Sequence, residues 1–350
     1  MAIEILFAGT DLAPLDPGRG ALEAVLGRWI AELSRTDRVS ALSFGSVGDG
    51  IRGALSGTVH EVSSHAEARA VVNGFDAGVV VLSNRPLWGT WAKGPVLHIL
   101  HNYPDAWGVS GTAELERCAE VLRRQPVAAV SRALAREVEL VASLPPASCA
   151  EVPPSIDPVF AATPYEPEGP VVLFPHRLLR KKGVELALAG FAEPACDGLE
   201  LVVTDNLNPW SAPTNEHSIL RRAVSAARCD VRLVPPVPPG AGMARLYASA
   251  RAVVCPSIAP EGLGLVALEA QAVGCPLVTS GLGGLREVTL PPNECMEGLD
   301  PRSFAEAVRR AVDRSYDMPG PVVLPERFTP RGSAAILLEA ITAAASVVRA

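Results

Sequence analysis

Short apolar runs typical of β-strands alternate with helical patterns along almost the whole chain, and this alternation limits the fold more than any other feature. The run Ala77–Leu82 is apolar at nearly every position, as expected for a strand covered by helices on both faces. Strands and helices that alternate in this way are typical of parallel, doubly wound sheets. We therefore expect an α/β fold.

The pattern places the expected elements in two series. First-half strands are expected at residues 2–8, 38–44, 58–63, 77–82, 95–100, 126–130 and 148–152. First-half helices are expected at 20–34, 111–123 and 131–142. Second-half strands are expected at 171–174, 199–204, 231–234, 252–255 and 276–279. Second-half helices are expected at 183–193, 215–228, 242–249, 264–273, 301–314 and 332–348.

A proline-rich stretch from Val152 to Pro170 interrupts the alternation and has little periodicity. Such segments are typical of linkers between domains. A chain of 350 residues also suits two domains of ordinary size. We predict a first domain over residues 1–160 and a second that begins at 161. In open α/β sheets ligands bind at the carboxyl ends of the strands, so we expect the binding and catalytic residues in the loops that follow the strands.

Composition excludes several functional classes. The net charge is −7 and the chain has no basic cluster, which argues against binding to nucleic acid or to an anionic membrane. The seven cysteines form no CxxC pair, as expected for buried free thiols in a reducing cytosol. The first residues read as a strand, so we expect no signal peptide, and no apolar run reaches the roughly 18 residues of a membrane span. We expect a soluble, cytoplasmic protein.

The densest chemical signal lies in the segment Pro256–Ala270. Its loop carries Glu261, and glycines at 262 and 264 allow a ligand to approach the backbone closely where a helix begins. The N-terminus of a helix suits phosphate, because its N–H groups are unpaired and its dipole end is positive. Glu269 follows about two helical turns later, and a carboxylate there suits vicinal hydroxyls such as those of a ribose. A nucleotide sugar supplies both phosphate and hydroxyls.

A second signal follows the strand expected at 171–174. Arg177 and Lys182 come directly after the strand, and Gly183 opens the next helix. A guanidinium grips two oxygens and an ammonium adds a mobile charge, so the pair is suited to neutralising a diphosphate leaving group. The two further cations, Arg180 and Lys181, are expected to face solvent.

These motifs, in this order, resemble the GT4 family of retaining glycosyltransferases. The Arg177–Gly183 motif precedes Glu261-x7-Glu269, and the segments 152–160, 274–278 and 283–288 look like further family motifs. The resemblance implies a GT-B fold, in which two Rossmann-like doubly wound domains face a cleft. Residues 1–160 would bind the acceptor and 161–330 the nucleotide-sugar donor. The helix in 331–350 would cross back to pack on the first domain.

The resemblance also implies roles in the donor domain. Arg177 and Lys182 would hold the diphosphate and act in catalysis, and Glu269 would bind the ribose. Glu261, a second catalytic residue, would bind hydroxyls of the transferred sugar. The resemblance implies two further groups of donor-site residues. Gly262, Leu263, Gly264 and Leu265 would contribute backbone N–H groups. Val234 and Pro235 would line the base pocket.

In the first domain the resemblance implies two further contacts. Gly18 and Gly20 stand where the family carries a glycine-rich loop, and they would touch the phosphates. His101 matches a catalytically important histidine at the end of a strand. Three departures from the family leave the donor base and sugar open. Gly18-Arg19-Gly20 is not the usual paired glycine, His176 replaces a small residue, and residues 204–215 replace a glycine-rich loop.

Tryptophans 88, 91 and 107 fall within 20 residues, in loops after first-half strands. They either fill the domain interface or shape the acceptor pocket, since flat aromatic faces suit sugars. We assign Trp88 and Trp107 to the acceptor, together with Asp105, which could orient an acceptor hydroxyl or pair with an amine.

The predicted activity is a retaining transfer of a sugar from a nucleotide-diphosphate donor to a small soluble acceptor, as in natural product biosynthesis. Without an Asp-x-Asp signature, we expect neither a metal nor any other cofactor. Residues 1–155 carry 13 basic and 17 acidic side chains, which favours a soluble acceptor over an anionic lipid. Alternatives are a nucleotide-dependent oxidoreductase, a sugar-nucleotide epimerase or other GT-B enzyme, and a non-catalytic nucleotide-sugar binder or partner subunit. The oxidoreductase predicts a Gly-x-Gly-x-x-Gly motif after the first strand, and the chain lacks it there.

Overall fold

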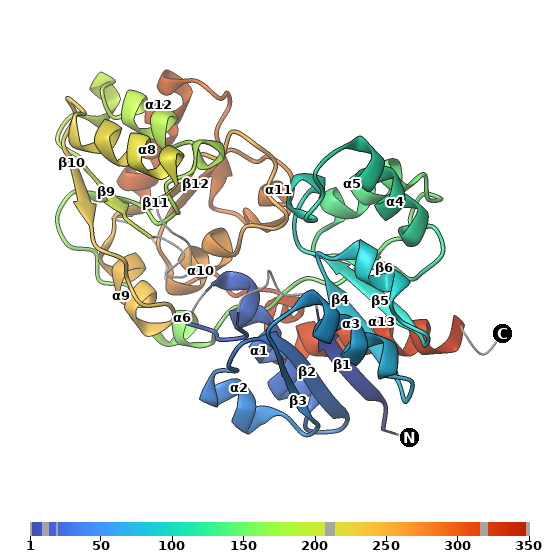
Figure 1. The fold of residues 1–350 in the computed structure, drawn as a ribbon. Coiled ribbons are helices and arrows are strands. Elements are labelled where there is room, and N and C mark those ends of the chain that lie inside the picture. The colour runs from blue at the N-terminus through green and yellow to red at the C-terminus, as the bar shows by residue number, and fades with distance from the viewer. Residues whose placement is uncertain (1, 9–13, 19, 207–213, 316–320, 348–350) are drawn as a thin grey trace. The chain divides into compact units, whose positions relative to one another are not determined.

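The computed structural model describes residues 2–8, 14–18, 20–206, 214–315 and 321–347. The chain forms two compact units, drawn in Figure 1. The first unit comprises Met1–Ser155 together with Glu326–Ala350, and the second comprises Ile156–Pro325. The observed boundaries therefore lie five residues before the positions expected from the sequence.

The first unit is built on a parallel sheet with the strand order β3-β2-β1-β4-β5-β6-β7. Its strands are β1 (Glu4–Ala8), β2 (Arg38–Phe44), β3 (Val59–Val62), β4 (Val79–Ser83), β5 (Val96–Leu100), β6 (Val127–Ala129) and β7 (Ala150–Glu151). Its helices are α1 (Ala21–Leu33), α2 (Asp49–Ala54), α3 (His65–Gly74), α4 (Thr112–Leu122), α5 (Arg132–Ala142) and α13 (Pro330–Val347). The chain winds outward from β1 in one direction and from β4 in the other, as in Rossmann-like folds.

Burial explains why the strands of this unit were easy to predict. Every residue of β4 and of β5 is buried, so these segments read as continuous apolar runs. The helices α2 and α3 gave no such signal. Only Ile51 is buried in α2, and only Ala68 and Val72 in α3. Such short helices fix too few apolar positions to show a 3.6-residue period.

The C-terminal helix α13 packs on the first unit, against α1, β4 and β5 (Figure 1, red). Its Leu337 and Ile341 are fully buried. A chain of hydrogen bonds fixes its first turns: the indole Nε1 of Trp29 donates to Ser333 Oγ at 2.7 Å, and that hydroxyl donates to the Pro153 carbonyl at 2.6 Å. The last part of the sequence thus completes the domain formed by the first part.

The second unit repeats the same architecture, with the strand order β10-β9-β8-β11-β12-β13 and all pairs parallel. Its strands are β8 (Val171–Phe174), β9 (Glu200–Thr204), β10 (Val231–Val234), β11 (Ala252–Cys255), β12 (Leu277–Thr279) and β13 (Glu294–Cys295). Its helices are α6 (Val159–Ala162), α7 (Val184–Gly190), α8 (Asn215–Ser225), α9 (Ala241–Ser249), α10 (Leu265–Val273), α11 (Leu285–Val288) and α12 (Pro301–Arg314).

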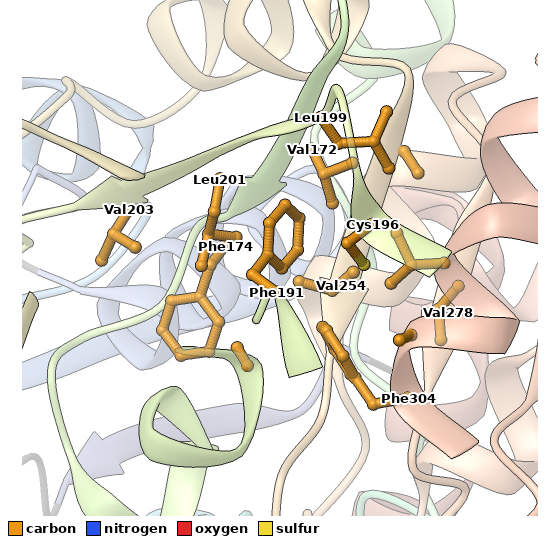
Figure 2. Packing of buried hydrophobic residues seen from close by; sticks show 14 of the residues in the cluster. Val172, Phe174, Phe191, Cys196, Leu199, Leu201, Val203, Val254, Val278 and Phe304 are labelled. Carbon is orange, nitrogen blue, oxygen red and sulfur yellow. The ribbon is translucent and has the colours of Figure 1, made fainter. Parts of the chain in front are cut away.

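The core of the second unit lies between its sheet and the helices α7 and α12. Phe174 of β8 and Val254 of β11 are fully buried there, and Phe191 packs 6.2 Å from Phe304 between ring centroids (Figure 2). Asp300 caps α12, because its carboxylate accepts a hydrogen bond from the backbone N–H of Ser303. The sheet is therefore packed between buried side chains, and the loops after its strands start from this core.

The proline-rich stretch Val152–Pro170 is more ordered than a simple linker. It contains the short helix α6, whose Phe160 is buried and which packs against α9 and α10. A helix of four residues is too short to show a 3.6-residue apolar period, so the sequence predicted only a linker here.

Among the described residues, no helix is both long enough and apolar enough to cross a membrane. All seven cysteines are free thiols.

Candidate active site

The candidate site follows from the strand order of the second unit. The chain enters the sheet at β8, continues to β9 on one side, and later returns to β11 on the other side. The loops after β8 and β11 leave the same edge of a parallel sheet at this switch point, where ligands bind in open α/β folds. These two loops carry the residues that the sequence singled out, 177–183 and 256–264.

A glycine brings the two loops into contact. Gly183 has a φ of +78°, and a Cβ at this position would overlap the carbonyl oxygen of Pro256. The contact continues along the backbone, since the N–H of Ile258 donates to the carbonyl of Lys181 at 3.0 Å. Only glycine combines the left-handed conformation with so close an approach.

Across this contact, Lys182 and Glu261 form an ion pair. The ammonium donates to both carboxylate oxygens, at 2.6 and 2.7 Å, and the Ser257 hydroxyl donates to Oε1. Both side chains are mostly buried, at 18% and 17% exposed. Burial acts to raise the pKa of Glu261, but the charge of Lys182 and these hydrogen bonds outweigh it, and the pKa lies below its usual value. Glu261 is therefore an ionised carboxylate at neutral pH.

The loop after Glu261 leads directly into α10. Gly264 precedes the helix with a φ of +103°, and Leu265 is the first helical residue. Gly262 and Leu263 are buried in the turn between the carboxylate and the helix. The first N–H groups of a helix have no intrahelical acceptor, so this end of α10 suits an anion. The residues 262–265 thus follow Glu261 directly in the chain and lead into the N-terminus of α10.

Glu269 lies in the middle of α10 and has a partner that the sequence did not reveal. The phenol of Tyr247, on α9, donates to Glu269 Oε2 at 3.0 Å. Tyr247 is fully buried, and burial together with the Glu269 carboxylate raises its pKa well above the usual value. The hydroxyl is therefore a permanent donor, which holds one oxygen of Glu269.

The other predicted donor residues lie at a strand end or in loops that follow strands of the second unit. Arg177 is exposed in the loop after β8, Val234 ends β10, and Pro235 is exposed just after it. Arg180 and Lys181 are exposed as expected, and Arg180 pairs with Glu185 at 3.0 Å. In the unusual 204–215 segment, residues 207–213 lie outside the described residues.

His176 belongs to the packing of the loop. Its ring is buried, and Nε2 donates to the Val254 carbonyl at 3.2 Å. Burial, and then the charge of Lys182, lowers its pKa to about 3, so the ring is neutral. The carbonyl of Val254, on β11, thus gives this buried ring a hydrogen-bond acceptor.

Gly18, Gly20 and His101 belong to the first unit. The two glycines are exposed between β1 and α1, and Gly20 precedes the helix in an extended conformation. His101 follows β5, with its ring 5.7 Å from that of Trp29. Its Nε2 is buried without a hydrogen-bond partner among the described residues, and burial lowers its pKa to about 3. A neutral imidazole at this position can position a ligand, but it cannot donate a proton as an imidazolium at neutral pH.

The two tryptophans assigned to the acceptor are buried instead in the first unit. Trp88 is 5% exposed and packs with Phe44 and Trp91, the latter stacked at 4.6 Å. Trp107 is 2% exposed, and its Nε1 donates to the Asn102 carbonyl at 2.9 Å. Neither ring presents a face to a ligand, so we correct both assignments to packing. Asp105 is exposed in the short turn Pro104–Ala106.

Two residues of the site were missed by the sequence reasoning, Ser257 and Tyr247. Ser257 stands four residues before Glu261 in an irregular loop, so its contact follows no period. Tyr247 lies 22 residues from Glu269 and reads simply as an apolar helix position. No group of three or more His, Cys, Asp or Glu side chains that could hold a metal occurs among the described residues.

Comparison with known proteins supports the resemblance drawn from the sequence. Residues 169–314 match the family model described as Glycosyl transferases group 1. The D-inositol 3-phosphate glycosyltransferase of Acidothermus cellulolyticus is 32% identical over 154 residues, which cover 42% of this chain and 34% of that protein. The match thus spans about a third of the curated relative's length.

Solved structures extend the similarity to the whole fold. Anabaena Alr3699/HepE in complex with UDP-glucose superimposes with a TM-score of 0.70 at 15% identity, covering 99% of this chain and 98% of that one. A glycosyltransferase from Rickettsia africae ESF-5 gives a TM-score of 0.69 at 13% identity, covering 98% of each chain. The chain therefore has the GT-B fold of these structures, and its residues 169–314 match the group 1 glycosyltransferase model.

Proposed function

We propose that this chain, whose residues 169–314 match the group 1 glycosyltransferases, transfers a sugar from a nucleotide-diphosphate donor to a small hydroxylated acceptor. The observation that supports the proposal is the position of the Lys182–Glu261 pair, whose Glu261 lies just before the N-terminus of α10. The same helix carries Glu269. In this arrangement a cation and helix N–H groups could bind a diphosphate. The two carboxylates could bind the hydroxyls of the ribose and of the transferred sugar.

Each part of the donor has a place in this arrangement. Lys182, Arg177 and the α10 N-terminus would bind the diphosphate, and Glu269 would accept hydrogen bonds from the ribose. Glu261 would accept them from the transferred sugar, because Lys182 and Ser257 use only three of about four acceptor directions of a carboxylate. Uridine is the base to test first, because Anabaena Alr3699/HepE was solved with UDP-glucose.

Charge on the departing diphosphate is the main barrier that these residues would lower. The Lys182 ammonium has three N–H groups and uses two on Glu261, so the third can reach a phosphate oxygen. Arg177 would add a second cation, and these two side chains would serve in place of a metal ion.

We further propose retention of configuration at the sugar. The bond from the sugar to the phosphate oxygen would break as the acceptor oxygen forms its bond on the same face. The acceptor proton would pass to the leaving phosphate. A neutral His101 would hold substrate by hydrogen bonding and would take no proton in this scheme.

We propose that the acceptor is a small polyol rather than a lipid. The first unit lacks an excess of basic side chains, which an anionic lipid surface would require. The curated relative is named for D-inositol 3-phosphate, so cyclitols and their phosphates are the first acceptors to test.

The test is a transfer assay. Purified protein is incubated with UDP-glucose, UDP-galactose or UDP-N-acetylglucosamine and a panel of cyclitols, and the glycosylated product is identified by mass spectrometry. The proposal expects product with at least one pair, an unchanged anomeric configuration by NMR, and unchanged turnover in EDTA. Nucleotide-sugar binding without product across the panel would instead favour a non-catalytic binder, and inversion would refute retention.

A further inference from the structure

A buried phenol is aimed at one of the carboxylates of the donor site. Tyr247 has no solvent exposure, yet it carries a polar hydroxyl into the interior of the second unit. Burying a hydroxyl is unfavourable unless it finds a partner. The partner of this one is Oε2 of Glu269, at 3.0 Å.

The ring that carries this hydroxyl is packed among three helices. Tyr247 extends from α9 toward α10, and its ring packs 5.8 Å from that of Phe160 on α6. These three helices contact one another. Because the ring is enclosed by packed helices, the position of its hydroxyl is fixed by the fold and does not depend on a bound ligand.

A fixed donor matters for a residue as flexible as glutamate. A partly exposed glutamate samples several rotamers, and ordering it on ligand binding costs conformational entropy. A partner that orders the carboxylate beforehand reduces that cost. The phenol also donates without withdrawing the carboxylate's charge, so Glu269 stays a strong acceptor for sugar hydroxyls.

We propose that Tyr247 is a positioning residue, which orients Glu269 toward the ribose of the nucleoside diphosphate and so sets the preference for ribose over 2′-deoxyribose. This inference rests on the proposed function, which places the ribose on Glu269. Tyr247 acts only through Glu269 and does not touch the donor.

The test compares ribo- and deoxyribonucleotides. Dissociation constants are measured by calorimetry for UDP, GDP and ADP, each beside its 2′-deoxy form, with wild-type, Tyr247→Phe and Glu269→Gln proteins. A hydrogen bond to a charged group is worth at least about tenfold in affinity, so the wild type should prefer the best ribonucleotide by that factor or more. In Tyr247→Phe the preference should fall to about threefold or less.

A matched control removes the same atom elsewhere. Tyr165 lies in the same unit, and its hydroxyl is 3.5 Å from the Arg251 carbonyl. Tyr165→Phe should keep the wild-type preference. If Tyr247 only fills space, Tyr247→Phe should weaken both nucleotides equally and leave their ratio unchanged, which would overturn the inference.

Two further readouts keep the proposal open to refutation. If Tyr247→Phe does not fold, the wild-type protein can be labelled with 3-fluorotyrosine at its four tyrosines and studied by fluorine NMR. Phe variants of the other three tyrosines assign their resonances, and the remaining resonance belongs to Tyr247. The Tyr247 resonance should shift more with the ribonucleotide than with its deoxy form, and equal shifts would contradict the inference. The Glu269→Gln protein separates the two claims. If Glu269→Gln keeps the ribose preference, or if no nucleotide binds to the wild type, the proposed donor site is wrong. If Glu269→Gln loses the preference and Tyr247→Phe keeps it, only the role of Tyr247 is wrong.

Discussion

The Lys182 ammonium lies 2.6 Å from Oε1 and 2.7 Å from Oε2 of Glu261, although 79 residues separate the two in the chain. Each side chain of the pair neutralises the charge of the other. A diphosphate would compete with Glu261 for the ammonium, and the sugar hydroxyls would then bind the carboxylate that the ammonium partly releases. The proposed function therefore predicts that donor binding and the geometry of this pair are coupled.

Gly183 is the residue that permits this geometry, and its replacement should damage the site. Gly183→Ala places a Cβ on the Pro256 carbonyl at a φ of +78°. We expect the two loops to separate and UDP affinity to fall at least about tenfold. The control is Gly198→Ala, at a φ of +76° in open space, which costs about 1–2 kcal/mol of stability and leaves UDP affinity unchanged. Equal UDP affinities in the two variants would refute the role of the loop contact.

Glu261→Gln should separate sugar recognition from nucleotide recognition. The amide is a weaker acceptor than the carboxylate, so we expect UDP-glucose affinity to fall about fivefold or more. UDP affinity should hold or rise, because Lys182 loses its competing negative charge. Glu185→Gln, at an exposed carboxylate of the same unit, is the control. A parallel loss for both ligands in calorimetry would place Glu261 on the nucleotide instead of the sugar.

The stability of the chain should depend on pH through its buried histidines. His101 has a folded-state pKa of about 3 against an ordinary value of 6.5, so between these values the unfolded chain takes up a proton that the folded chain does not. Stability is therefore complete above pH 6.5 and falls as the pH drops toward 3, by about 1.4 kcal/mol per pH unit for this residue. Urea unfolding at pH 6.5 and 5 should show that His101→Phe removes about 2 kcal/mol of this loss. An unchanged pH slope in the variant would contradict the neutral, buried state of His101.

The C-terminal helix should depend on one hydroxyl. Ser333→Ala deprives the Trp29 indole of its acceptor and the Pro153 carbonyl of its donor, all in the buried interior of the first unit. We expect a loss of about 2–3 kcal/mol in urea unfolding. Ser346→Ala, on the exposed face of the same helix, should change stability by less than about 0.5 kcal/mol. Similar values for both variants would show that the buried hydrogen bonds do not hold α13.

The sequence predicted the two sheets well because their central strands are covered on both faces. β4 and β11 are buried at every position, and such runs need no tertiary information to recognise. The short helices were missed for the opposite reason. In α3, for example, only Ala68 and Val72 face the core, so most of its surface reads as loop.

The two loops of the candidate site were also visible in the sequence, because glycines, cations and carboxylates stand together there. Their mutual geometry was not visible. The Lys182–Glu261 pair depends on how two loops meet at Gly183. Tyr247 differs from other core tyrosines only because its hydroxyl contacts Glu269. Trp88 shows the converse: a tryptophan in a loop reads equally as a sugar platform or as packing, and burial decides for packing.

Calorimetric titration of UDP into the wild-type, Lys182→Ala and Lys181→Ala proteins tests the central claim most directly. Lys181 is the neighbouring lysine on the exposed side of the same turn. We expect saturable binding to the wild type, a loss of about 10- to 150-fold in Lys182→Ala, and little change in Lys181→Ala. Wild-type affinity in Lys182→Ala would contradict the placement of the donor diphosphate at the Lys182–Glu261 pair.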